Sequence, residues 1–266
     1  MKTVLLLVHD DVGQEARLQT ALDLTRSLDG HLTCVDVTPT PIFAGDIGGA
    51  AQAMVLAEER KVETANRATL QTRLSQEAVA WDWIDATGDF TRCLMQEAGL
   101  SDLIVVNSKR DTWRDLEPRG VVASILTQAR CPVVAAPDHV RGFDASGAAM
   151  VAWDGSEAVA TTLRACVPLL KLASSVRLFT VEDVGEGASA EAAALYLSEH
   201  GIHAEVDRMA ADGAKPDDLI LTACAALDIS YCVMGAFGHG RLTEEVFGGV
   251  TRRMLDAAQL PLVMGR

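Results

Sequence analysis

The pattern of apolar and polar residues switches repeatedly between two periods along the chain. Short apolar runs such as 4–8 and 103–106 are typical of buried strands. Between them, apolar residues recur every three or four positions, as Leu18, Ala21 and Leu22 do, which predicts amphipathic helices. The chain is therefore expected to alternate strands and helices.

This alternation occurs twice, on either side of a polar, turn-rich linker at 137–147. The first run has predicted strands at 4–8, 31–37, 80–86, 103–106 and 132–136, and predicted helices at 15–28, 51–78, 91–98 and 121–129. The second has predicted strands at 148–153, 176–181, 202–208, 231–234 and 260–264, and predicted helices at 158–172, 188–200, 217–226 and 244–257. Strands separated by helices need crossover connections. The sequence thus predicts an α/β fold of two tandem doubly wound domains, 1–138 and 147–266, each a five-stranded, mostly parallel sheet flanked by helices.

The two runs can also be aligned residue by residue, which indicates a duplicated domain. Residues 4–10 match 148–154, so that Asp10 aligns with Asp154, and residues 102–107 match 230–235. The last strand of each copy is apolar and would be an exposed sheet edge, which invites a pairing partner.

Composition narrows the class of partner. The chain has 37 acidic and 23 basic residues and a net charge of −14. Such a surface repels phosphate backbones and anionic lipids, which disfavours nucleic-acid and membrane partners. A nucleotide site is still compatible with this charge, because backbone N–H groups and Mg²⁺ offset it locally.

The sequence also predicts the cellular location of the protein and the state of its cysteines. The apolar run at the N-terminus is too short for a signal peptide or a membrane span, so a cytoplasmic protein is expected. Six scattered cysteines without a C-x-x-C pair predict buried, reduced thiols and no metal ligands.

A glycine-rich segment directly follows the predicted strand 231–234. Within fifteen residues stand Gly235, Gly238, Gly240, Gly248 and Gly249. Glycine permits left-handed backbone and close approach, so successive N–H groups can converge on phosphate oxygens. No Gly-Lys-Ser/Thr follows, which excludes a Walker A loop. The residues alone favour a phosphate-binding loop, with a flexible surface loop as the alternative.

A second loop of interest is Asp154-Gly155-Ser156, at the carboxyl end of the strand 148–153. Ligands of open α/β sheets bind at this end of the strands. Ser156 is positioned to cap the following helix. By itself the loop is equally consistent with an ordinary strand–turn–helix junction.

With these residues the chain resembles a tandem member of the universal stress protein A family. The nucleotide-binding branch of that family carries Gly-x₂-Gly-x₉-Gly-(Ser/Thr) after the fourth strand, and Gly235, Gly238 and Gly248 fit the spacing. Gly249 stands where the family usually has Ser or Thr, and Thr251 is a candidate replacement for the missing hydroxyl. The resemblance implies an adenine nucleotide alpha hydrolase-like fold.

The resemblance also implies specific contacts. Asp154 would contact the adenosine moiety, and the backbone of Val181 would contact adenine. The implied nucleotide-binding set is Asp154, Gly155, Ser156, Val181, Gly235, Gly238, His239, Gly240, Arg241, Gly248, Gly249, Val250 and Thr251. In the family the last strands pair across a two-fold, which here implies an internal pseudo-dimer of the two domains, with a homodimer as a further option.

The first copy departs from the motif. It reads Asn107-Ser-Lys-Arg110 and Arg119-Gly120, so most of the glycines are replaced. We therefore expect the first copy not to bind nucleotide in the same way, because side chains fill the space that phosphates need. The alternatives are a basic anion pocket formed by Lys109, Arg110 and Arg119, or a solvated loop.

Other candidate sites are weaker. His200 and His203 straddle a predicted helix end and strand start, so no metal site is expected there. Residues 58–63 predict a solvated helix face with salt bridges. No Ser-His-Asp or Cys-His arrangement and no paired carboxylates stand out.

The sequence therefore predicts a cytoplasmic stress-response protein whose second domain binds ATP, or AMP or ADP, with Mg²⁺, as a regulatory ligand. No catalytic residue is predicted, since His239, Arg241, Glu244 and Glu245 lie near the loop without a spacing that places a base or nucleophile. The alternatives are a slow ATPase or nucleotidyl transferase, and a non-binding scaffold that uses the first domain as an interaction surface.

Overall fold

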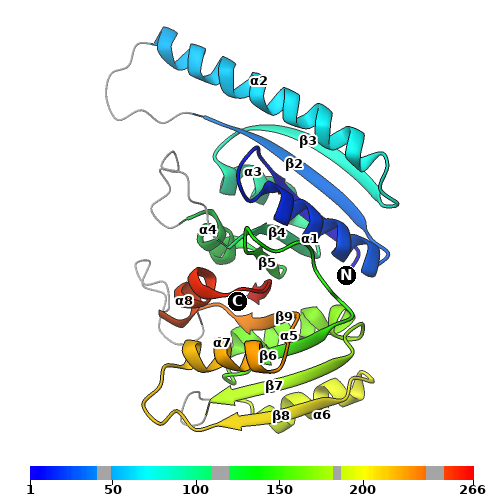
Figure 1. Cartoon of the computed structure of the whole chain (residues 1–266), viewed down its shortest axis with the longest axis vertical. Helices are drawn as coiled ribbons and strands as arrows, with labels where there is room; N and C mark the ends of the chain where they lie inside the picture. Colours follow the sequence, from blue (N-terminus) through cyan, green and yellow to red (C-terminus); the bar gives the residue numbers. More distant parts are fainter. Residues whose placement is uncertain (41–48, 109–119, 182–186, 238–248) are drawn as a thin grey trace.

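The computed structural model describes residues 1–40, 49–108, 120–181, 187–237 and 249–266, without the side chains of 49–52. Strands and helices alternate as predicted (Figure 1). The N-terminal half contains β1 Thr3–Val8, α1 Gln14–Ser27, β2 His31–Pro39, α2 Gly49–Leu74, β3 Ala80–Gly88, α3 Phe90–Glu97, a 3₁₀ turn Ala98–Leu100, β4 Leu103–Asn107, α4 Val121–Gln128 and β5 Val133–Ala136. The C-terminal half contains β6 Ala148–Ala152, α5 Glu157–Leu170, β7 Ser175–Val181, α6 Ala190–Glu199, β8 Ala204–Met209, α7 Pro216–Ala226, β9 Tyr231–Gly235, α8 Gly249–Ala257 and β10 Leu262–Gly265.

The strands form one continuous sheet in the order β3-β2-β1-β4-β5-β10-β9-β6-β7-β8. Within each half neighbouring strands are parallel, and the halves meet where β5 runs antiparallel to β10. The α/β class and the mostly parallel sheet flanked by helices are thus confirmed. The apolar last strands pair with each other at the centre of the sheet, which removes the exposed edges expected for them.

The register of this sheet relates the two halves by a pseudo-two-fold. Val134 of β5 lies opposite Val263 of β10, and the ladders leading outward from this pair make Leu6 of β1 the counterpart of Val151 of β6. Counting on from Leu6 and Val151, His9 takes the place of Asp154. The predicted alignment of Asp10 with Asp154 is therefore wrong by one residue, because similarity of apolar runs does not fix strand register.

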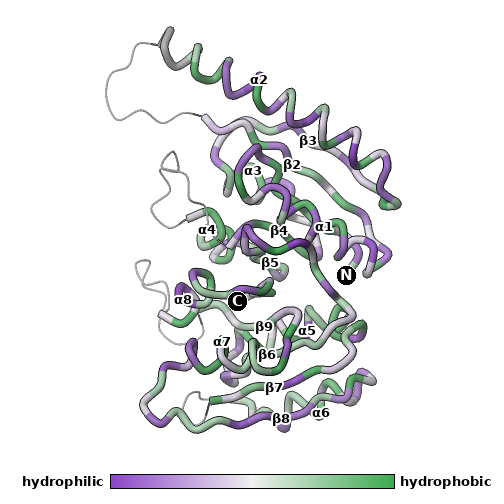
Figure 2. The backbone as a smooth tube through the Cα atoms, in the orientation of Figure 1, coloured by the Kyte–Doolittle hydropathy of each residue, from purple (hydrophilic) through white to green (hydrophobic). Residues whose placement is uncertain are grey.

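Helices cover both faces of the sheet and bury two apolar clusters. One contains the β1 residues Val4, Leu6 and Val8, and the other the alternate residues Leu5 and Leu7. This alternation follows from the two-residue period of a strand. In Figure 2, α2 carries many hydrophilic positions, whereas helices such as α4 and α5 show mostly hydrophobic colour.

The structure modifies two sequence predictions about side-chain burial. Glu63, expected on a solvated helix face, is 3% exposed and faces the sheet, although Lys61 and Glu58 of the same segment do form a surface ion pair at 3.0 Å. The cysteines are unpaired and buried, except that Cys131 is half-buried. Among the described residues, no helix is long and apolar enough to cross a membrane.

Candidate functional site

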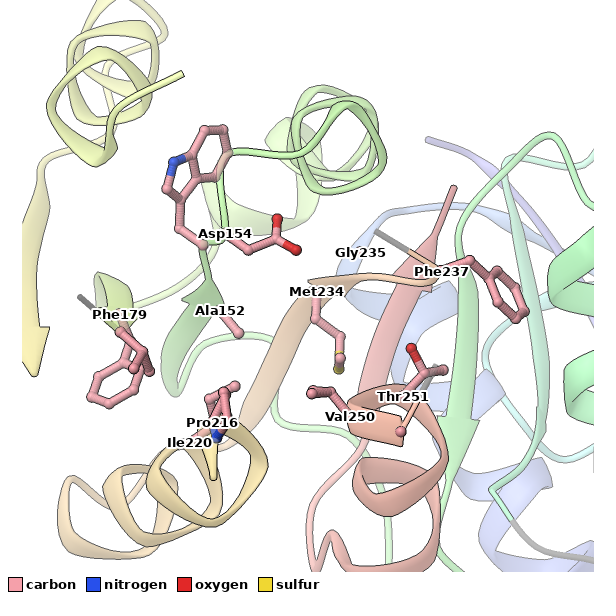
Figure 3. Close-up of a pocket in the computed structure, with 13 residues that line it drawn as sticks. Ala152, Asp154, Phe179, Pro216, Ile220, Met234, Gly235, Phe237, Val250 and Thr251 are labelled. Carbon is pink, nitrogen blue, oxygen red and sulfur yellow. The ribbon is translucent and has the colours of Figure 1, made fainter. Parts of the chain in front are cut away.

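A cavity of about 150 Å³ opens at the carboxyl ends of β6, β7 and β9. Its lining comes from these three strands, from the first turn of α7 and from the start of α8 (Figure 3). The lining residues are Ala152, Trp153, Asp154, Phe179, Val181, Pro216, Ile220, Met234, Gly235, Phe237, Gly249, Val250 and Thr251. This is the edge of the sheet at which α/β proteins bind ligands.

The loop after β6 holds Asp154 at the rim of this cavity. Asp154 Oδ1 accepts a hydrogen bond from Ser156 N–H at 3.0 Å, which closes a tight turn. Ser156 Oγ in turn accepts from Val159 N–H at 3.3 Å and caps α5, as predicted. Gly155 between them has φ +75°, a conformation that glycine adopts without strain. Local sequence therefore fixes both the turn and the carboxylate it carries.

A second loop, after β7, braces the first. Trp153 Nε1 donates to the Ala188 carbonyl at 2.9 Å. Gly155 and Gly187 cross in backbone contact, and a Cβ on Gly187, whose φ is +137°, would overlap the Gly155 carbonyl oxygen. Only glycine at position 187 allows the two loops to approach this closely. The position of Asp154 consequently depends on the backbone of both loops.

The end of β9 forms the side of the cavity next to α5. A Cβ on Gly235 would lie 2.8 Å from Val159 N and 3.2 Å from Ala158 Cβ, so the absence of a side chain lets α5 pack against the strand. Phe237, two residues on, has φ +66° and lines the cavity. A bulky residue in the left-handed region is a strained conformation of the kind that concentrates at ligand sites.

The first turn of α8 closes the cavity opposite Asp154, and Val250 and Thr251 lie on that side in Figure 3. Unpaired N–H groups and the helix dipole make such a helix start favourable for negative charge. Thr251 is 4% exposed. Among the described residues, a Cβ on Gly249 would meet no atom within 4 Å.

The structure brings together most of the described residues that the sequence singled out. Asp154, Val181, Gly235, Gly249, Val250 and Thr251 line one cavity, with Gly155 and Ser156 in its first loop. Gly238, His239, Gly240, Arg241 and Gly248 lie outside the described residues, as do Glu244, Glu245, Lys109, Arg110 and Arg119.

Sequence reasoning missed the apolar wall of the cavity. Phe179 precedes Val181 by two positions and therefore shares its face of β7, which is a signal the alternation could have given. Pro216 and Ile220 come from α7 and Met234 from β9. Their convergence depends on the crossover of α7, which no local pattern specifies.

At the corresponding strand ends in the N-terminal half, other side chains replace Gly235 and Asp154. Asn107, the counterpart of Gly235, is 4% exposed and donates to Gly13 O at 3.1 Å and to Asp138 Oδ1 at 2.6 Å. It also accepts a hydrogen bond from Arg17, which is 1% exposed. His9, the counterpart of Asp154, packs edge-on against Phe90 with ring centroids 4.9 Å apart.

Of the two histidines considered as metal ligands, His200 contacts Tyr196. His200 lies at the end of α6, where its Nδ1 is 2.9 Å from the Tyr196 carbonyl and its ring packs against that of Tyr196. In the part of the chain that the structure describes, no group of three or more His, Cys, Asp or Glu side chains is arranged to hold a metal ion.

Comparison with known proteins relates both the sequence and the fold to one family. The family model described as the universal stress protein family matches residues 1–137. Comparison with curated proteins gives no match.

Solved structures share the fold at low sequence identity. A universal stress protein from Archaeoglobus fulgidus is 14% identical, with a TM-score of 0.75 over 99% of this chain and 96% of that one. A Pseudomonas aeruginosa protein assigned to the universal stress proteins is 16% identical, with a TM-score of 0.60 over 100% of this chain and 93% of that one. An Archaeoglobus fulgidus universal stress protein in complex with dAMP is 18% identical, covering 45% of this chain and 97% of its own, with a TM-score of 0.34.

Proposed function

The chain belongs to the universal stress protein family, and from that premise we propose that its C-terminal half binds an adenine nucleotide as a regulatory ligand. One observation carries the proposal. Asp154, Val181 and Gly235, which the family resemblance singles out from distant parts of the sequence, line a single cavity together with the first turn of α8. A shared cavity is what a common ligand requires of residues so far apart along the chain.

The chemistry of the lining suits the parts of a nucleotide. Phe179, Val181 and Ile220 offer an apolar surface for a purine ring. The Asp154 carboxylate can accept hydrogen bonds from ribose hydroxyls. The start of α8, at Gly249, supplies N–H groups and a positive dipole end for phosphate oxygens.

The nucleotide is proposed to be ATP, with ADP and AMP as the related ligands, accompanied by Mg²⁺. Asp154 is the carboxylate that lines the cavity among the described residues. Mg²⁺ is commonly held by one or two carboxylates, phosphate oxygens and water, so a single acidic residue fits a phosphate-bound ion. We assign to the site nucleotide binding, with weak ATP hydrolysis at most.

We further propose that residues 1–138 and 147–266 are tandem domains and that the chain binds one nucleotide. The mirrored strand order on either side of the β5–β10 pair supports the division. In the N-terminal half, His9 stands in place of Asp154 and packs against Phe90, and Asn107 replaces Gly235. A cytoplasmic stress-response role would use nucleotide occupancy of the second domain as the signal.

Equilibrium dialysis of the purified protein with ATP, ADP and AMP, with and without Mg²⁺, tests the proposal. The wild type is expected to bind one nucleotide per chain. Asp154→Ala should weaken binding at least tenfold, because a hydrogen bond to a charged group contributes about 1.5–3 kcal/mol. Asp10→Ala is the matched control, since it removes an exposed carboxylate after β1. Absence of binding at millimolar nucleotide would refute the proposal.

A further inference from the structure

Helix α2 is attached to the sheet by a buried cluster of carboxyl groups and a histidine. Glu63 of α2 is 3% exposed and Asp36 of β2 is 4% exposed, and the two carboxyl groups are neighbours, with Asp36 Oδ1 buried without a hydrogen-bond partner among the described residues. Glu63 Oε1 also accepts a hydrogen bond from Asp10 N–H at 3.4 Å. His9 Nδ1 lies 2.5 Å from the same oxygen, at ion-pair distance but without hydrogen-bond alignment.

Two carboxyl groups in contact away from water cannot both ionise without a large cost, so one proton is shared between them. The pKa of Asp36 is raised to about 8, mainly because burial disfavours its charge and next because Glu63 lies beside it. Asp85 of β3 raises this pKa further, whereas Arg67 of α2 lowers it. On β2 itself, burial raises the pKa of Cys34 to about 12, so that this thiol stays uncharged.

Few other buried side chains anchor α2 among those described, and ion pairs of Arg67 with Asp85 and of Arg73 with Glu15 also connect it to β3 and α1. None of the residues 53–62 is buried, and α2 extends along β2 and β3 at one end of the molecule (Figure 1). Leu70 and Leu74 are its buried apolar residues among those described. Asn66 exchanges hydrogen bonds of 2.7 and 2.8 Å with Gln14 of α1. The state of the carboxyl pair therefore weighs heavily in how firmly α2 is held.

We propose that Asp36 and Glu63 form a proton-operated latch that holds α2 on the sheet more tightly in acidic than in alkaline solution. The ligand of this site is the proton. When α2 is released, Asp36 is solvated and its pKa returns toward the ordinary value of 3.8. Because the docked pKa is the higher one, protonation favours docking.

The pH window follows from these two values. The contribution of Asp36 to docking is complete below about pH 4 and is lost as the pH rises through about 8. Above that pH the docked and released forms are both ionised at Asp36, and a further rise changes nothing. The strand register makes Thr180 the counterpart of Asp36, so the latch is a property of the N-terminal half.

Hydrogen–deuterium exchange of peptides from α2, measured between about pH 5 and 9, tests the latch. Asp36→Asn keeps a donor for Glu63 but cannot ionise, and comparison at each pH cancels the intrinsic rate of exchange. The wild-type opening constant relative to Asp36→Asn is expected to rise by up to about tenfold per pH unit and to level off above about pH 8. A constant ratio across the whole range would overturn the proposal.

Two further variants keep the test decisive. Glu63→Gln removes the neighbouring charge, which is the second cause of the raised pKa of Asp36, whereas burial remains. The rise in α2 exchange should therefore level off at a lower pH than in the wild type, and this readout holds even if Asp36→Asn folds poorly. Asp82→Asn removes a carboxylate on the neighbouring strand β3 whose side chain is 74% exposed, and it should behave as the wild type does. A plateau at the same pH in Glu63→Gln as in the wild type, or a rise that vanishes in Asp82→Asn, would contradict the latch.

Discussion

Restoring a hydroxyl at position 249 offers a direct test of the phosphate end of the proposed site. Gly249 begins α8 and lines the cavity, and a Cβ there would meet no atom of the described residues within 4 Å. Gly249→Ser therefore collides with none of the described residues. Gly249→Ala is the matched control, because it adds the same Cβ without the hydroxyl.

The size of the effect can be estimated from the position of the residue. A hydrogen bond to a charged group contributes about 1.5–3 kcal/mol when buried. Gly249 is exposed at the rim of the cavity, which reduces the expected gain to about 1 kcal/mol, or roughly fivefold in affinity. Both variants also gain helix stability of about 0.5–1 kcal/mol over glycine, so their difference isolates the hydroxyl.

Isothermal titration with ATP and with adenosine is the appropriate assay. Gly249→Ser should bind ATP about three- to tenfold more tightly than Gly249→Ala, whereas adenosine, which has no phosphates, should bind both variants equally. Equal ATP affinities would show that position 249 does not face the phosphates. Tighter adenosine binding by Gly249→Ser would indicate that the adenosine moiety, and not the phosphates, lies at α8.

Three other substitutions probe the scaffold of the site. Gly187→Ala should weaken nucleotide binding at least tenfold in the same titration, because the added Cβ displaces the Asp154 loop. Gly213→Ala is its control: at φ +81° it strains the backbone, but its Cβ meets no described atom within 4 Å, so nucleotide affinity should not change. Arg17→Ala should lower the free energy of urea unfolding by about 3–5 kcal/mol, because it removes the charge partner of the Asp11 carboxylate and the guanidinium donor of the Leu7 and His9 carbonyls. Arg26→Ala, at a side chain 35% exposed, should cost less than about 1 kcal/mol, and equal losses would contradict the burial argument. Ser156→Ala should cost about 1 kcal/mol and lower Tm by about 2–4 °C in calorimetry, and an unchanged Tm would mean that the cap contributes nothing.

Local sequence was sufficient to predict the order of elements and parts of the site. Strand and helix periods recur along the chain, and their boundaries in the structure lie within a few residues of those predicted. The Ser156 cap and the turn at Asp154 involve neighbours in the sequence, so their geometry was also predictable. Such features depend on φ, ψ and side chains only a few residues apart.

Features that join distant segments were decided by the tertiary structure. His9, not Asp10, takes the place of Asp154, because the register of the whole sheet and not local similarity aligns the halves. The buried pairing of Asp36 with Glu63 arises where α2 packs on β2, and nothing in either segment alone distinguishes these carboxylates from solvated ones. Periodicity tells which face of an element is buried, whereas the packing of one element on another decides which side chains meet there.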